Sequence, residues 1–283
     1  MLADLVRKFT YFPDRANDLS PQSWRLAAER VNAISLTTDD GLTLNGWHFL
    51  ADAGQADRRA SDSTPERPRK PVALFFSGNG GHRAYRVAEA GLLTGAGADV
   101  FLFDYRGYGD NPGEPSEESL AADARAAWRY ATNEQQVDPR SIFLYGESLG
   151  GAVATRLAAE FCAAGAPPAG LILRSTFSTL ADVARHHYPV LPIQMLMVER
   201  YASTERIAQV TCPILMLHGQ QDTIVPYLLG RKLFAAAPAT ASDGTPKRFV
   251  DLPHADHNDI IETEGALAQT AITKVITESW RQP

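Results

Sequence analysis

From residue 71 onward, short apolar runs alternate with longer stretches that carry apolar residues at helical spacing. Runs of this length indicate buried strands rather than helices. Continuous apolar strands separated by helices are typical of a parallel sheet that is covered by helices on both faces. We therefore expect strands at 72–76, 100–103, 142–145, 171–173, 214–217 and 249–252, with helices at 83–93, 118–131, 149–163, 227–236 and 265–280.

A different pattern precedes this region. Residues 33–37 and 42–49 indicate two strands, and Asp40 and Gly41 lie in the short connection between them. An Asp-Gly pair between two strands is a strong hairpin signal, because glycine adopts the positive φ that tight turns require. An antiparallel strand pair therefore opens the predicted sheet.

Two segments depart from the alternation of strands and helices. Residues 51–70 are polar and lack apolar periodicity, so we expect an exposed polar insertion there. Residues 175–211 are more than a crossover between parallel strands needs, and they include Met195, Met197 and Tyr201. We expect a small helical lid over the carboxyl edge of the sheet, whose apolar residues pack down and also line an acyl pocket. Both segments are inserted in one α/β domain, 1–283.

The run Gly146, Glu147, Ser148, Leu149 and Gly150 is the most informative motif of the chain. An apolar strand enters it and a helix-forming stretch leaves it, which is the context of a nucleophile elbow. The serine of such a turn has a strained backbone, and small residues two positions before and after it let strand and helix approach. We expect Ser148 to present its hydroxyl at the carboxyl edge of the sheet.

A serine hydroxyl is a weak nucleophile near neutral pH, so Ser148 needs a base and an acid that orients the base. After this kind of elbow the acid and then the histidine follow in later strand-end loops. Asp222 follows the strand at 214–217, and His257 follows the strand at 249–252. His254 is an alternative base, and three nearby acids lack a strand-end position of their own: Asp251, Asp256 and Asp259. We favour Asp222 and His257, and expect His218 to be a structural histidine that binds the backbone.

A tetrahedral intermediate also needs N–H donors for its oxyanion. The backbone amide of Leu149, directly after the nucleophile, is one expected donor. The second should come from the loop after the first central strand, 77–82, where glycines let the backbone turn its amides inward. Asn79 is our choice, with Gly80 as the alternative. A phosphate-binding loop is excluded, because no Gly-Lys-Ser/Thr follows these glycines.

Charge and composition limit the kinds of partner that the chain is expected to bind. The formal net charge is −6 and no basic run interleaves with aromatic residues, so we expect no nucleic-acid partner. The only cysteines, Cys162 and Cys212, do not have metal-ligand spacing, and they suit a reducing, cytoplasmic compartment. We expect no metal and no organic cofactor, and a small-molecule or acyl substrate as partner. The sequence does not give the oligomeric state.

No stretch approaches the roughly eighteen apolar residues of a membrane-spanning helix, so no integral membrane segment is expected. Near the start of the chain, an apolar stripe has basic neighbours, which leaves peripheral membrane contact open. We favour packing of this stripe on the domain. The stripe consists of Leu2, Leu5, Val6 and Phe9.

With these motifs in order, the chain resembles the α/β-hydrolase superfamily, and within it a short-lid group of serine hydrolases that includes bacterial proteins and eukaryotic relatives similar to acyl-protein thioesterases. The resemblance implies an α/β-hydrolase fold and a triad of Ser148, Asp222 and His257. Two departures stand out, because relatives commonly carry histidine at the position of Ser77 and small glycines before the catalytic histidine. Further segments carry the resemblance: Thr10 to Pro13, Asp40 to Leu42, Gly46 and Trp47, Asp104 to Gly109, Leu217 to Gly219, Ile224 to Pro226, and His257 to Asp259.

Together these features predict a serine hydrolase that cleaves a carboxylic ester or thioester through an acyl-enzyme intermediate. A peptidase acting on short peptides would use the same triad with a polar or acidic subsite for the substrate amine. A non-catalytic scaffold that binds a ligand or partner would keep the fold but usually loses a triad member, and here all three are present.

Overall fold

A computed structural model of the chain describes residues 7–8, 10–51, 70–190 and 197–280. The apolar stripe at Leu2, Leu5, Val6 and Phe9 lies outside the described residues, as do residues 52–69 of the predicted polar insertion. Among the described helices, none combines the length and the hydropathy that a bilayer crossing requires.

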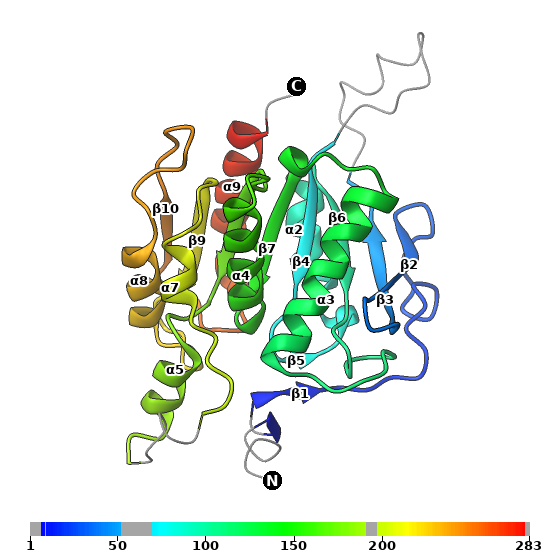
Figure 1. Ribbon diagram of the computed structural model, residues 1–283, viewed down its shortest axis with the longest axis horizontal. Coiled ribbons are helices and arrows are strands. Elements are labelled where there is room, and N and C mark those ends of the chain that lie inside the picture. The colour runs from blue at the N-terminus through cyan, green and yellow to red at the C-terminus, as the bar shows by residue number, and fades with distance from the viewer. Residues whose placement is uncertain (1–6, 9, 52–69, 191–196, 281–283) are drawn as a thin grey trace.

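Eight strands form one twisted sheet in the order β10-β9-β8-β7-β4-β6-β3-β2 (Figure 1). The two strands at one edge run antiparallel to each other, and β3 is also antiparallel to β6, whereas every other neighbouring pair is parallel. The prediction of a mostly parallel sheet opened by an antiparallel pair is therefore confirmed. The strands are β2 (Val31–Thr37), β3 (Thr43–Phe49), β4 (Val72–Phe76), β6 (Asp99–Phe103), β7 (Ile142–Glu147), β8 (Gly170–Arg174), β9 (Ile214–Gly219) and β10 (Arg248–Leu252).

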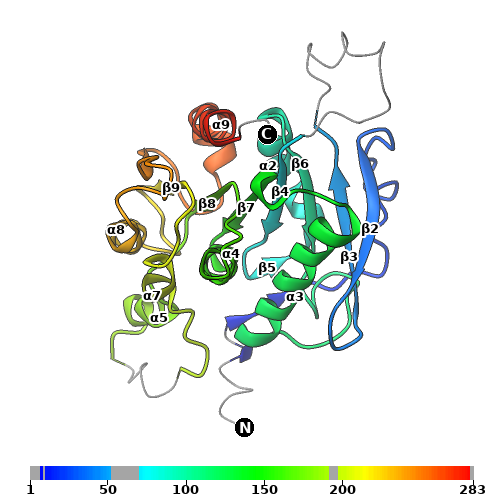
Figure 2. The same cartoon turned by 45° about the horizontal axis from the view of Figure 1, so that its top comes forward.

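Helices cover both faces of this sheet, as the strand pattern predicts (Figure 2). One face carries α2 (Val87–Gly95) and α9 (Ile260–Ser279), and the other carries α3 (Glu117–Arg129), α4 (Leu149–Ala163), α7 (Ser203–Ile207) and α8 (Tyr227–Ala236). The last helix begins at Ile260, one turn before the predicted start at 265. Glu264 interrupts the helical geometry of α9 with φ −133°, so the sequence pattern marks only the part after this kink.

The central strands separate two hydrophobic cores because successive side chains of a strand point to opposite faces. Leu74 and Leu144 pack into the core beneath α3 and α4, whereas Phe75 and Tyr145 pack into the core beneath α2 and α9. Every residue of β4, β7, β8 and β9 is buried, which explains why their sequences are apolar without alternation.

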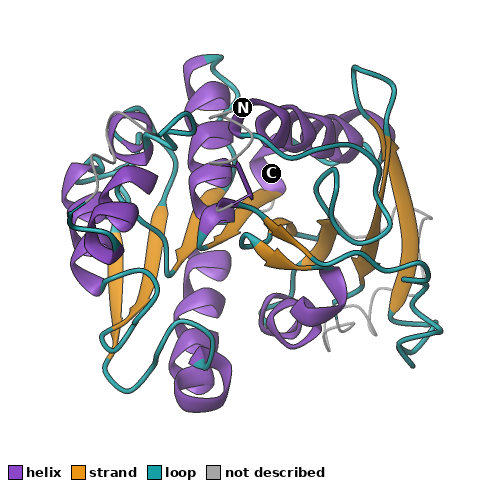
Figure 3. Ribbon diagram, turned by 90° about the horizontal axis from the view of Figure 1, so that it is seen from below, coloured by secondary structure: helices purple, strands orange, loops and turns teal. Residues whose placement is uncertain are grey.

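At the carboxyl ends of the parallel strands, loops and short elements form the edge seen from below in Figure 3. Here β1 (Phe12–Pro13) pairs with β5 (Gly80–Gly81), which follows β4. A short 3₁₀ turn at Arg83–Arg86 leads into α2. Within the segment 175–211, α5 (Leu180–His187) and α7 are helical, and residues 191–196 lie outside the described residues.

Candidate active site

Ser148 lies in the sharp turn between β7 and α4. Its backbone has φ 51° and ψ −116°, a conformation that is strained for a residue with a side chain. The turn is possible because strand and helix approach closely at glycines: a Cβ on Gly150 would lie 2.0 Å from the carbonyl oxygen of Phe76. On Gly146 it would lie 2.5 Å from the carbonyl oxygen of Gly150. The motif thus has the geometry of a nucleophile elbow.

Asp222 and His257 approach each other from the loops after β9 and β10. The distance between His257 Nδ1 and Asp222 Oδ2 is 2.8 Å. The other carboxylate oxygen of Asp222 accepts the N–H groups of Ile224 at 3.0 Å and Val225 at 2.7 Å, which fixes the orientation of the carboxylate. With Nδ1 bound to Asp222, the Nε2 atom of His257 is left for proton exchange.

His218 is a second histidine beside the same carboxylate. Its Nε2 lies 2.9 Å from the carbonyl oxygen of Val225 and 3.2 Å from Asp222 Oδ2. The expected backbone contact is therefore present, and the contact with Asp222 is an addition that the sequence pattern does not indicate. Burial acts to raise the pKa of Asp222, but hydrogen bonds from His218 and His257 outweigh it and hold that pKa well below its ordinary value. Asp222 is accordingly ionised across the physiological pH range.

The alternative base and the nearest acid have other contacts. His254 is exposed, and its backbone N–H donates to Glu264 at 3.2 Å. Asp256 accepts hydrogen bonds from the N–H of Thr223 at 2.7 Å and from the N–H of His257 at 2.7 Å. These amide contacts lower the pKa of Asp256 and connect the loop of the acid to the loop of the base. Asp256 therefore binds the backbone of both loops.

Ser148 and His257 line one pocket of about 450 Å³, a volume suited to a small organic substrate. Asn79 lines it from the loop after β4, and Ile224 from the loop after β9. Several polar side chains that the sequence analysis did not single out line it as well: Asp14, Tyr85 and Arg86. Tyr85 and Arg86 are adjacent, but both lie far from Asp14 and from Ser148 in the sequence, so no local motif marks them.

The loop that contains Asn79 is anchored by the N-terminal segment. The side-chain amide of Asn79 donates to the carbonyl oxygen of Thr10 at 2.8 Å. The Asn79 carbonyl accepts the N–H of Phe12 at 2.9 Å and the hydroxyl of Tyr108 at 3.0 Å. The bond to Thr10 uses one of the two side-chain N–H donors and fixes the orientation of the amide. Leu149 is the first residue of α4, so its N–H has no acceptor within the helix.

Glu147, the residue directly before Ser148 in the motif, is buried. It accepts the N–H of Gly78 at 3.2 Å, contacts Arg174 at 2.9 Å and forms a short hydrogen bond with Arg86. Burial acts to raise its pKa, but the two guanidinium groups outweigh burial and lower it. Its partners belong to three separate elements, so the motif around Ser148 does not reveal them.

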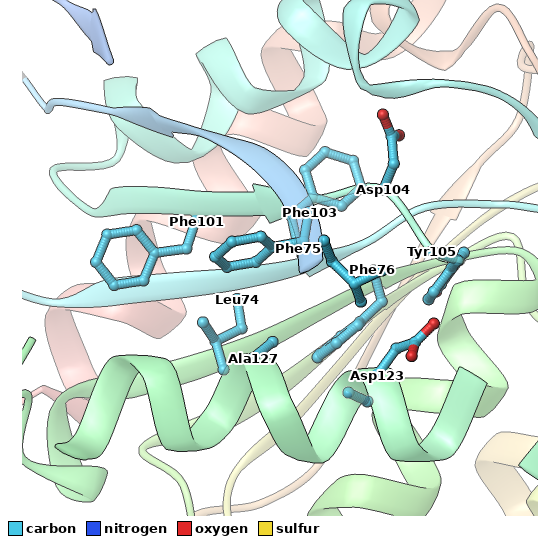
Figure 4. A pocket seen from close by; sticks show the side chains of 11 residues that line it. Leu74, Phe75, Phe76, Phe101, Phe103, Asp104, Tyr105, Asp123 and Ala127 are labelled. Atoms are coloured by element: carbon cyan, nitrogen blue, oxygen red, sulfur yellow. The ribbon is translucent and has the colours of Figure 1, made fainter. Parts of the chain in front are cut away.

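A second cavity lies between α3 and the sheet, where Phe76, Tyr105 and Asp123 surround it (Figure 4). Its volume is about 10 Å³, enough for roughly one water molecule and too small for a substrate. In the part of the chain that the structure describes, no cluster of three His, Cys, Asp or Glu side chains could hold a metal ion.

Comparison of sequences gives a consistent set of relatives. Residues 67–202 match the family described as serine aminopeptidase, S33. The chain is 42% identical over 273 residues to the uncharacterized protein Rv2307c of Mycobacterium tuberculosis, covering 96% of this chain and 88% of the relative. It is 32% identical over 235 residues to the lysophosphatidylserine lipase ABHD12 of Danio rerio, covering 76% of this chain and 61% of the lipase.

Solved structures share the fold. An α/β hydrolase from Vibrio vulnificus superposes with a TM-score of 0.69 at 19% identity, covering 96% of this chain and 98% of the other. The Pyrococcus furiosus esterase Pf2001 superposes with a TM-score of 0.67 at 15% identity, covering 95% of this chain and 97% of the other. At these identities the likeness concerns the arrangement of strands and helices.

Proposed function

The chain belongs to the α/β-hydrolase superfamily, and from this premise we propose that it is a serine hydrolase that cleaves carboxylic esters or thioesters through an acyl-enzyme. The observation that carries the proposal is the 2.8 Å contact between His257 Nδ1 and Asp222, made where His257 shares a pocket with Ser148. Esterase and lipase relatives support hydrolysis of this class. Ser148 is the proposed nucleophile.

In the proposed mechanism, His257 Nε2 takes the proton of Ser148 as its oxygen attacks the substrate carbonyl. The ionised Asp222 stabilises the imidazolium that forms and keeps the ring in the required tautomer. The backbone N–H groups of Leu149 and Asn79 bind the oxyanion, each contributing about 3 kcal/mol where such donors have been measured. His257 then protonates the leaving group, and a water molecule releases the acyl group from Ser148 by the same steps.

Two exposed, largely apolar side chains of the pocket favour an acyl chain as part of the substrate. Ile224 and Tyr85 line the pocket and are 44% and 55% exposed. Exposed large apolar side chains near a pocket mark binding surfaces for apolar ligands. Because ABHD12 is a lysophosphatidylserine lipase, single-chain lysophospholipids are the first physiological class to test.

A substrate panel tests this proposal. p-Nitrophenyl esters of two to sixteen carbons, lysophosphatidylserine and acyl-CoA thioesters are assayed with the wild type and with Ser148→Ala. We expect hydrolysis of at least one ester or thioester class, a preference for medium or long acyl chains, and loss of turnover in Ser148→Ala. Hydrolysis that survives in Ser148→Ala would overturn the assignment of the nucleophile. A preference confined to acetyl esters would argue against an acyl pocket beneath a lid.

Peptide hydrolysis is the second candidate, because Asp14 places a carboxylate at the pocket where a substrate amine could bind. The match to the serine aminopeptidase family is a second reason to assay peptide substrates. Aminoacyl p-nitroanilides distinguish the two activities. If the chain is a peptidase, it will cleave them and Asp14→Asn will raise KM for them selectively. Ester turnover with no cleavage of the anilides would exclude this candidate.

We also propose a cytoplasmic location. Cys162 and Cys212 are both free thiols, which suits a reducing compartment. Fractionation of cells that express the tagged protein tests this proposal. Recovery of the protein in a secreted or membrane fraction would contradict it.

A further inference from the structure

Arg174, the last residue of β8, connects the backbone of the nucleophile to the backbone of the base. Its carbonyl oxygen accepts the N–H of Ser148 at 2.8 Å. Its side chain, in a residue only 6% exposed, donates from Nη1 to the carbonyl oxygen of His257 at 2.8 Å. The remaining guanidinium nitrogens bind two carboxylates, Glu89 at 2.6 Å through Nε and Glu147 at 2.9 Å through Nη2.

Glu147 extends this connection to the loop that should bind the oxyanion. One of its oxygens faces Arg174, and the other accepts the N–H of Gly78, the residue directly before Asn79. Arg86 binds the same oxygen of Glu147 and also donates to the carbonyl oxygen of Gly80 at 2.9 Å. Two hydrogen-bonding routes therefore run from Glu147 to the two sides of Asn79.

The cluster contains two carboxylates and two guanidinium groups, so its charges balance beside Ser148. Burial of ion pairs is weak evidence for a contribution to stability, because the desolvation cost can exceed the Coulombic gain. The planar guanidinium of Arg174 offers donors in fixed directions and can hold three partners at set angles. A buried cluster of this kind is better suited to fixing geometry than to strengthening the fold.

We propose that Arg174 and Glu147 are positioning residues, which set the distances between the Ser148 hydroxyl, the His257 imidazole and the Asn79 N–H. This inference rests on the proposed function, since it assumes that these three groups react together. Misplacement of reacting groups by about 1 Å can cost on the order of 100-fold in rate. Loss of either positioning residue should therefore lower kcat while leaving KM, which depends on the rest of the pocket, nearly unchanged.

Two conservative variants test the proposal. Arg174→Lys keeps the charge but cannot reach three partners at once. Glu147→Gln keeps the shape and an acceptor for the Gly78 N–H, but it loses the charge that pairs with both guanidinium groups. Arg106→Lys is the matched control, because Arg106 is 7% exposed and pairs with Asp123 and Asp40, which do not line the pocket of Ser148.

Turnover of a p-nitrophenyl ester is measured per active site, and sites are counted by fluorophosphonate labelling. We expect kcat to fall about 10- to 100-fold in Arg174→Lys and about 10-fold in Glu147→Gln, with KM within about threefold of wild type. The double variant should lose less than the product of the single losses, because both residues act through one network. Arg106→Lys should lower the thermal midpoint and retain kcat per site.

Equal losses of kcat in Arg174→Lys and Arg106→Lys would overturn the positioning role. Disruption of any buried ion pair would then explain the loss. If Arg174→Lys does not fold, Glu147→Gln decides, and wild-type kcat in that variant overturns the proposal. Failure of the proposed function has a different signature. In that case the wild type would show neither ester turnover nor labelling that depends on Ser148.

Discussion

At the scale of single residues, the site depends on a strained backbone conformation of Ser148. Ser148 has a positive φ of 51°, which costs about 1–3 kcal/mol for a residue with a side chain. Thr176 helps to hold this conformation by donating its hydroxyl hydrogen to the carbonyl oxygen of Ser148 at 2.8 Å. The strain is compatible with folding because strand, helix and neighbouring loop all constrain the same turn.

The role proposed for Asp222 predicts a large effect of Asp222→Asn. An asparagine amide can donate to His257 Nδ1, so it would hold the wrong tautomer and could not stabilise the imidazolium. We expect kcat for an ester to fall by about 10⁴-fold. Asp256→Asn is the control, because Asp256 binds the N–H of His257 rather than its ring, and we expect it to stay within about tenfold of wild type. Equal losses in both variants would contradict the assignment of Asp222.

The elbow predicts a strong dependence on glycine at position 150. Gly150→Ala would place a Cβ 2.0 Å from the carbonyl oxygen of Phe76, so strand and helix must separate. We expect the unfolding free energy to fall by about 2 kcal/mol or more, with loss of ester turnover. Gly91→Ala in α2 is the matched control, since outside the adjacent residues and the local helix backbone no heavy atom lies within 4 Å of its Cβ position. It should be neutral or add up to about 1 kcal/mol of stability in urea unfolding.

At the scale of elements, the sequence predicts the sheet better than the edge that holds the site. Buried strands such as β4 and β7 have uninterrupted apolar sequences, and Asp40 and Gly41 mark the hairpin, where Gly41 adopts φ 82°. The pairing of β1 with β5 could not be predicted, because each strand contributes only two residues and they are far apart in the sequence. The same reason applies to Arg174 and Glu147, which meet only after β7 and β8 pair.

The anchoring of the Asn79 loop by β1 leads to a graded prediction. Asn79→Ala removes the side-chain bond to Thr10 but keeps the backbone N–H proposed for the oxyanion. We expect kcat to fall about tenfold, because the loop loses one of its anchors while the donor remains. Steady-state kinetics with a p-nitrophenyl ester measures this effect. A loss above about 10³-fold would point to the side-chain amide as the donor, and unchanged kcat would argue against the anchoring role.

At the scale of the whole molecule, two hydrophobic cores stabilise a sheet, and the three residues of the proposed triad lie at its carboxyl edge. Of the proposed triad, Ser148 follows β7, Asp222 follows β9 and His257 follows β10. Each loop is short relative to the sheet beneath it, so the sheet limits how far these side chains can move apart. Ionised groups buried at this edge then connect the stability of the whole domain to pH.

Glu147 provides a test of this connection. Its folded pKa is lowered by Arg174 and Arg86 against the effect of burial, so its contribution to stability is present above the ordinary glutamate pKa of about 4.3. That contribution is lost as pH falls through the lower folded pKa. Urea unfolding should therefore show a stability difference between wild type and Glu147→Gln that stays nearly constant from pH 7 to about pH 5 and shrinks below about pH 4.

Asp104 affects the pH dependence of the unfolding free energy in the opposite direction to Glu147. Burial, opposed by Arg83, raises its pKa to about 6, so its contribution is lost as pH rises through that value. Asp104 is present in both proteins, and its effect cancels in the difference. A difference that stays constant or grows as the pH falls below about 4 would contradict the ionised state of Glu147.

Active-site labelling tests the central claim most directly. The wild type, Ser148→Ala, His257→Ala and His254→Ala are treated with a fluorophosphonate, and the modified peptide is identified by mass spectrometry. The account predicts a single adduct on Ser148, no labelling in Ser148→Ala, labelling slowed on the order of 10³-fold or more in His257→Ala, and near wild-type labelling in His254→Ala. An adduct on another residue, or labelling that persists in Ser148→Ala, would contradict it.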